Sequence, residues 1–315
     1  MRTAPFIHID NNVAVMDLKI IAALLPCVVY AVFSYGIRAL VLTVFTTVLW
    51  ILCETAVKKV TGRGSLRDLS PAVNGIVLAM LLPPGTSLYM AAVAVLFGSI
   101  AVKGLFGGEG AVFVNPSAAG RLFVEICFPS RMAGFYPVGI KMLSYRSLID
   151  MGIPAETAVS DHSDFRPVEL IAGNYPTFIG TGCLIMVIIG LVYLIVKRSI
   201  RLETPVAFIA IIIIGRLIVD VRNGFYNTFV FIMTSGIIFV AVFIMSDITT
   251  TSRKGLKGVL MGMIGGLVAV ALSLRGNPAV TLCVPPLAVG LISGFMDFTD
   301  SAGRKMREKG GEEDA

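Results

Sequence analysis

The sequence has few charged residues. Only 15% of its 315 residues are Asp, Glu, Lys or Arg, against about 25% in a typical soluble domain. A chain with so little charge cannot cover a soluble globule of this size, so the composition excludes a soluble enzyme, a disordered protein and a nucleic-acid binder. Histidine occurs twice, and the five cysteines form no CxxC pair. This scarcity excludes most metal centres. Any electron transfer must therefore use a cofactor that needs no Cys or His ligand.

Long apolar runs take the place of the missing charge. A membrane-spanning helix needs about 20 mostly apolar residues, and the chain offers ten candidate runs. They lie at 20–37, 39–57, 69–102 (divided in two at Pro83-Pro84-Gly85), 111–129, 177–196, 204–219, 228–246, 258–274 and 279–296. The pattern predicts an all-α, polytopic membrane protein with about ten transmembrane helices. We expect no removable signal peptide, because the first run reads as the first span.

Basic residues gather in every second connection between these runs. Cytoplasmic loops carry an excess of Lys and Arg, so this bias predicts cytoplasmic N- and C-termini in the cell membrane. The same clusters predict anionic lipid as a partner. The basic groups are Lys58, Lys59, Arg63 and Arg67; Lys197, Arg198 and Arg201; Arg253, Lys254 and Lys257; and Arg304, Lys305, Arg307 and Lys309.

One connection is long and polar. Residues 130–176 fall on the extracytoplasmic side and separate a first membrane half, 1–129, from a second half, 177–298. Residues 299–315 form a charged cytoplasmic tail. Five spans in each half force the halves into opposite orientations, which is the arrangement of inverted repeats. Asn74-Gly75-Ile76 and Ser235-Gly236-Ile237, in the third and eighth spans, add thin support.

A glycine-rich segment lies between the fourth and fifth spans. It contains Gly107 and Gly108 and ends at Asn115-Pro116, which interrupts a helix where the fifth span begins. Glycines allow close backbone approach. The segment is either a re-entrant turn that lines a cofactor or an ordinary turn between helices.

Ionisable residues inside or beside the apolar runs offer two further interpretations. Asp247, followed by Thr249, closes the eighth span and is either an ion-linked carboxylate or a solvated residue at a helix end. Arg121 lies four residues before Glu125, and Arg216 four before Asp220, so each pair shares one helix face. A mutual salt bridge is the simpler interpretation for both pairs.

Four motifs together resemble the RnfD family of membrane subunits, which belong to Rnf electron-transport complexes. Residues 68–84 (DLSPAVNGIVLAMLLPP) look like the family's third span, and 102–121 resemble its VKxLFGGxGxNxxNPAxAGR signature. Residues 173–181 are similar to GNxPGxxGETS, and 245–255 to ATDPVTSPVTKKGK. Order and spacing agree from about residue 6 to residue 300. The related NqrB subunit of the sodium-pumping quinone reductase shares this core.

The resemblance implies a function and a cofactor. The chain is expected to be a flavin-carrying subunit of an ion-translocating ferredoxin:NAD+ oxidoreductase that couples electron transfer to Na+ or H+ movement. Its partners would be other Rnf-type membrane subunits and an RnfG-like flavoprotein. The cofactor would be FMN, attached through a phosphoester to a threonine of the outer loop, or noncovalent riboflavin. The flavin-lining candidates are Asn74, Gly75, Gly107, Gly108, Asn115, Arg121 and Thr249, and Asp247 is the candidate for ion coupling.

The expected FMN attachment motif, D-G-x-S-x-A-T, is degenerate here. Its nearest match is residues 150–157, in which Glu156 separates Ala155 from Thr157 and no Ser precedes the Ala. Either Thr157 is a degenerate acceptor or the subunit lacks the covalent flavin. Two alternatives stay open for the whole protein. One is an inverted-repeat channel or secondary transporter without a redox cofactor, with helices broken at Pro83-Pro84 and Pro285-Pro286. The other is a structural scaffold that has lost its flavin.

Overall fold

The computed structural model describes residues 13–62, 68–105, 112–132, 134–135, 153–154, 167–173, 175, 177–220, 225–247 and 255–313. These residues are helical almost throughout, as predicted. The one exception in regular structure is a two-residue antiparallel pair of strands, β1 (Gly134–Phe135) and β2 (Ile153–Pro154).

The helices run in the order expected from the apolar runs. In the first half they are α1 (Val13–Tyr35), α2 (Ile37–Thr61), α3 (Ser70–Leu81), α4 (Leu88–Leu96), the π-helix η1 (Phe97–Gly104), α5 (Pro116–Cys127) and α6 (Pro129–Met132). Later in the chain come α9 (Pro167–Ala172), α10 (Leu184–Val196), α11 (Glu203–Val219), α12 (Phe225–Thr234), α13 (Ile237–Phe239), the π-helix η3 (Val240–Ile244), α14 (Leu256–Ser273) and α15 (Pro278–Glu313).

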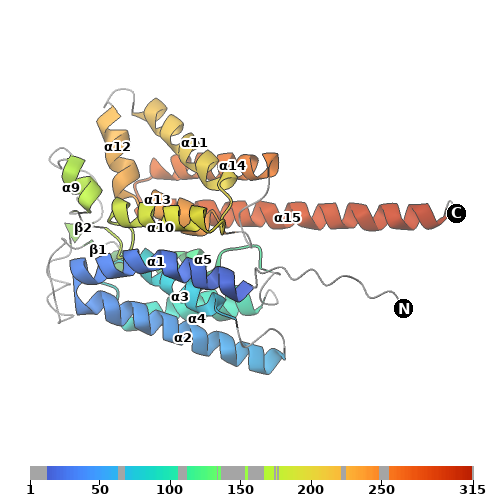
Figure 1. The fold of residues 1–315 in the computed structure, drawn as a ribbon, viewed down its shortest axis with the longest axis horizontal. Coiled ribbons are helices and arrows are strands. Elements are labelled where there is room, and N and C mark those ends of the chain that lie inside the picture. Colours follow the sequence, from blue (N-terminus) through green and yellow to red (C-terminus); the bar gives the residue numbers. More distant parts are fainter. Residues whose placement is uncertain are drawn as a thin grey trace.

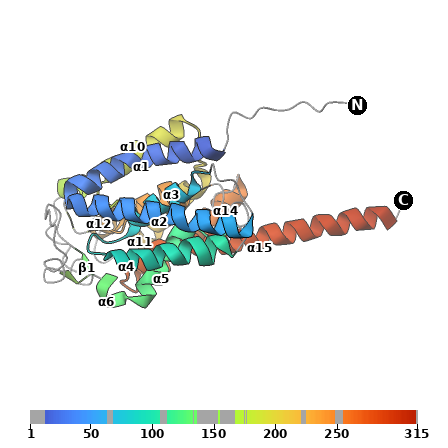
Figure 2. The same cartoon turned by 90° about the horizontal axis from the view of Figure 1, so that it is seen from below.

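The long helices lie side by side along one axis (Figure 1). Helices α1 to α5 form one group, and α11, α12 and α14 form another. Two contacts join the groups, because α10 packs along α1 and α15 packs against α5. A view from below shows α10 beside α1 again, with the C-terminal part of α15 extending away from the bundle (Figure 2).

Several helices can cross a membrane. By length and composition, four described helices pass the test for a span: α1, α2, α14 and the Ala279–Met296 part of α15. A fifth span forms if α12 and the α13–η3 segment, which meet at an angle of 60°, count as one broken span. Helices α3, α4–η1 and α10 are apolar but shorter. The chain is therefore a multi-pass helical membrane protein.

The two proline pairs behave differently. The break at Pro83-Pro84 is confirmed, because α3 ends at Leu81 and α4 begins at Leu88. The break at Pro285-Pro286 is wrong, since both prolines lie inside α15, which is continuous from Pro278 to Glu313. Each of these prolines removes a helical hydrogen bond. Leu282 and Val289, on either side of the pair, are buried, so packing compensates. The helix also runs through residue 298, where the charged tail was expected to begin.

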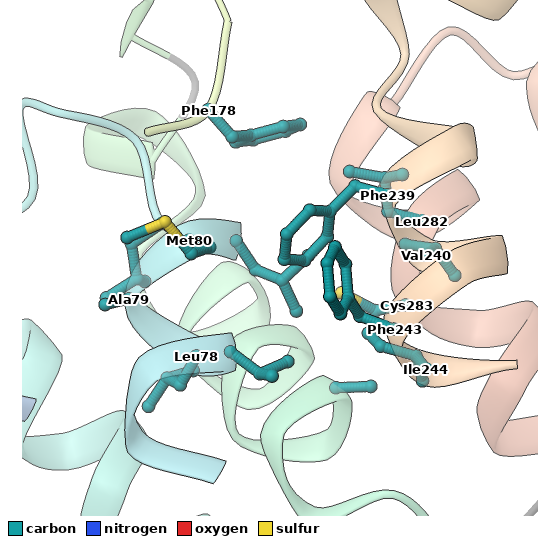
Figure 3. Packing of buried hydrophobic residues seen from close by; sticks show 14 of the residues in the cluster. Leu78, Ala79, Met80, Phe178, Phe239, Val240, Phe243, Ile244, Leu282 and Cys283 are labelled. Carbon is teal, nitrogen blue, oxygen red and sulfur yellow. The ribbon is translucent and has the colours of Figure 1, made fainter. Parts of the chain in front are cut away.

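The two groups of helices share one hydrophobic core (Figure 3). Phe239 and Phe243 stack at a centroid distance of 4.9 Å and face Met80 at the end of α3. Phe178 closes the core from one side and Leu282 of α15 from another. The end of α3 therefore lies where both groups meet, deep inside the protein.

Candidate functional site

The C-terminal end of α3 is capped by residues far away in the sequence. A helix leaves its last carbonyl groups without helical partners, and these cannot turn to water inside a membrane protein. The amide of Gly180 donates to the carbonyl of Met80 at 3.0 Å, and that of Ile179 donates to Leu82 at 3.1 Å. Nε of Arg121 donates to the carbonyl between them, Leu81, at 3.0 Å. Three consecutive carbonyls thus find partners.

Residues 177–183 (the capping segment) are held in place by tyrosine hydroxyls. Tyr35 of α1 donates to the carbonyl of Thr177 at 3.2 Å, and Tyr175 donates to that of Gly182 at 2.9 Å. Gly180 must be glycine, because a Cβ there would lie 2.3 Å from Sδ of Met80. The resemblance singled out this segment, but nothing in the sequence predicted that it caps α3.

Arg121 connects this cap to the second half of the protein. Its Nη1 pairs with Oε2 of Glu125 at 2.8 Å, which confirms the predicted salt bridge, and its guanidinium lies 5.5 Å from the ring centre of Phe178. Oε1 of Glu125 accepts from Nδ2 of Asn277 at 3.4 Å. A polar chain therefore links α3, α5 and the start of α15. Arg121 is 1% exposed, and its Nη2 is buried without a hydrogen-bond partner among the described residues.

Asn115 and Asn277 begin their helices in the same way. Oδ1 of Asn115 accepts from the amides of Ser117 and Ala118, each at 3.1 Å. Oδ1 of Asn277 accepts from the two corresponding amides of α15, at 3.1 and 3.2 Å. In each case a proline occupies the first helical position, where its missing N–H costs nothing. The Asn-Pro pair is thus an N-cap at the start of both α5 and α15.

Asn74 and Gly75 lie where α3 meets its neighbours. Oγ of Ser117 donates to the carbonyl of Asn74 at 2.9 Å. Gly75 has no room for a side chain, because a Cβ would lie 2.6 Å from Cα of Thr47 in α2. The structure therefore brings Asn74, Asn115 and Arg121 together along α3 and α5.

These residues fit a flavin only in part. Gly75 and the Asn115 side-chain oxygen are committed to helix contacts. The buried Nη2 of Arg121 is suited to a carbonyl or anionic oxygen of a flavin ring, and the half-buried Asn74 lies on the same pair of helices. Gly107, Gly108, Thr157 and Thr249 lie outside the described residues.

The second half carries a polar cluster at the end of α11. Arg216 pairs with Asp220 at 2.9 Å, as predicted, and lies 4.3 Å from the ring centre of Phe231. Thr228 of α12 donates to Asp220 at 3.1 Å. Asp247 is half-buried directly after η3. These contacts fasten α11 to α12.

Comparison with known proteins gives one consistent result. The profile of the NQR2, RnfD, RnfE family matches residues 1–283. An RnfD-type component of the proton-translocating ferredoxin:NAD(+) oxidoreductase complex of Clostridium ljungdahlii is 25% identical, over 94% of this chain and 92% of that protein. Its counterpart in the Na(+)-translocating complex of Acetobacterium woodii is 25% identical, over 87% and 85%. An NqrB-type component of the Na(+)-translocating NADH-quinone reductase of Chlamydia felis is 37% identical over 28% of this chain and 18% of that protein.

We expect Arg121→Met to lower the free energy of unfolding by about 3 kcal/mol, because it leaves the buried Glu125 carboxylate and the Leu81 carbonyl without their partner. The double variant Arg121→Met/Glu125→Gln should recover part of this loss. Unfolding in detergent measures both, and Arg275→Met, at an exposed arginine, should change stability by less than about 0.5 kcal/mol. Equal effects at Arg121 and Arg275 would contradict the buried ion pair.

Proposed function

Because the chain belongs to the NQR2, RnfD, RnfE family, we propose that it is the RnfD component of an ion-translocating ferredoxin:NAD+ oxidoreductase, a redox-driven pump. The observation that carries this proposal is similarity over nearly the full length of both chains to the corresponding components of such complexes. Similarity to the quinone reductase component covers a much smaller part of the chain. The protein passes electrons through the membrane, and the complex couples that transfer to Na+ or H+ transport.

The proposed cofactor is a flavin, either FMN linked to Thr157 or noncovalent riboflavin. A flavin supplies one- and two-electron chemistry without Cys or His ligands, which agrees with the composition of the chain. On the described residues, the buried Nη2 of Arg121 would donate to the ring, and Asn74 would offer an amide. Phe178, over the guanidinium, excludes water from this donor.

The proposed architecture has ten spans in two inverted halves. Repeated features support it. Asn-Pro caps open both α5 and α15, the fifth and last helices of their halves. The ends of α2 and α11, the second helices, each carry an ion pair four residues apart. The eighth span is broken at Ser235-Gly236, and the third ends early at Leu81.

The orientation follows from the basic loops. We propose cytoplasmic termini, an extracytoplasmic loop at 130–176 and contact with anionic lipid at the basic clusters. The loop would face an RnfG-like flavoprotein, and the spans would contact other membrane subunits. Asp247, at the cytoplasmic end of η3, remains our candidate for ion coupling.

Affinity purification of the tagged chain from its own cells tests the assignment. Other membrane subunits and a flavoprotein should copurify, and the preparation should reduce NAD+ with reduced ferredoxin. Deletion of the gene should abolish that activity in membranes, and a plasmid copy should restore it. A chain that purifies alone and transports a solute without redox partners would instead establish the channel or transporter alternative.

Fluorescence of the denatured protein in a gel tests covalent FMN. With a flavin transferase co-expressed, wild-type protein should give a fluorescent band, and Thr157→Ala should lose it because no other acceptor matches the motif. Ser147→Ala, in the same loop, should keep the band. An unlabelled wild-type band would refute the phosphoester link.

A further inference from the structure

A second buried ion cluster lies at the other end of α3, apart from the Arg121 site. Glu54 of α2 is the centre of this cluster. Its Oε1 lies 2.8 Å from Nζ of Lys103 in η1 and 3.0 Å from Nζ of Lys58 in α2. The side chains of Glu54 and Lys103 are only 4% and 6% exposed. Neither residue stood out in the sequence, because they are far apart along the chain.

Two further oxygen groups complete the cluster. Oδ2 of Asp68, just before α3, lies 3.0 Å from Nζ of Lys58. Oγ of Ser70, the first residue of α3, bonds Nζ of Lys103. The Lys103 ammonium is therefore held by a carboxylate and a hydroxyl, oxygen groups of the kind that hard cations take in proteins.

Lys103 reaches these oxygens from a π-helix. The amide of Leu105 bonds the carbonyl of Ile100, five residues back, at 3.1 Å. Such π segments are rare and often mark functional sites, because the extra residue redirects the side chains that follow. The register of η1 thus places an ammonium group beside Glu54.

The cluster is costly as a purely structural element. Burying four charged side chains incurs a desolvation penalty, and well-packed apolar residues of similar volume are often at least as stable. In addition, Oε2 of Glu54 is buried without a hydrogen-bond partner among the described residues. A carboxylate oxygen left in this state is an available cation ligand.

We propose that Glu54, Asp68 and Ser70 form a monovalent-cation site in which the Lys103 ammonium is a tethered, exchangeable occupant and Na+ is its competitor. The charges support exchange. Glu54 and Asp68 balance Lys58 and Lys103, so a sodium ion is balanced only when the Lys103 ammonium leaves. The proposal rests on the proposed function, because exchange at the cytoplasmic side would load the pump with its ion. It does not involve Asp247.

Equilibrium binding of radioactive Na+ to the full-length chain, purified in detergent, tests the site directly. Lys103→Gln removes the competitor and should bind Na+ at least about tenfold more tightly than wild type, given the size of effects between neighbouring charges. Lys59→Gln is the matched control, because Lys59 is exposed one residue from Lys58. It should bind as wild type does, and excess choline should displace nothing.

Glu54→Gln should abolish the binding. Because this change leaves two buried lysines short of a partner, Glu54→Gln/Lys103→Gln serves as the neutral variant, and it should fold without binding Na+. The proposal is overturned if Lys103→Gln binds no more tightly than wild type, if Lys59→Gln gains equally, or if the neutral variant still binds. The assay needs no electron donor or partner protein, so its result is independent of the copurification test of the proposed function.

Discussion

The structure depends on a helix that ends inside the hydrophobic core. In a membrane protein, a backbone carbonyl that water cannot reach must find its partner within the protein. Helix α3 ends at Leu81, and its final carbonyls accept hydrogen bonds from the capping segment and from Arg121. Gly180 allows the close approach, and Tyr35 and Tyr175 hold the segment from outside. One backbone requirement thus ties the start of the second half to the third helix of the first.

Charged side chains serve two purposes in this frame. Arg121 completes the cap, and Glu125 balances its charge and reaches α15 through Asn277. This network is structural in most of its bonds, with one guanidinium nitrogen left for a ligand. At the opposite end of α3, the ammonium groups of Lys58 and Lys103 share one oxygen of Glu54, while its other oxygen has no such bond. A cofactor donor at one end and an exchangeable cation at the other would place electron and ion chemistry on the same helix.

Local patterns in the sequence predicted the local structure well. The helical class, the break at Pro83-Pro84 and the two Arg-to-acid pairs four residues apart all follow from rules that act within a few residues. The same rules failed at Pro285-Pro286, because packing on both sides of α15 outweighs two missing hydrogen bonds. The contacts that define the site are long-range. No periodicity indicates that Ile179 caps Leu82 or that Lys103 meets Glu54, since each pair joins elements that only the folded chain brings together.

Hydrogen exchange at the amides of Ile179 and Gly180 tests the central claim most directly. In protein labelled selectively with 15N-isoleucine and 15N-glycine, both amides should exchange as slowly as those in the interior of α3, because each donates to a buried carbonyl of that helix. Exchange at the rate of an exposed loop would contradict the cap, and with it the account of how the two halves are joined.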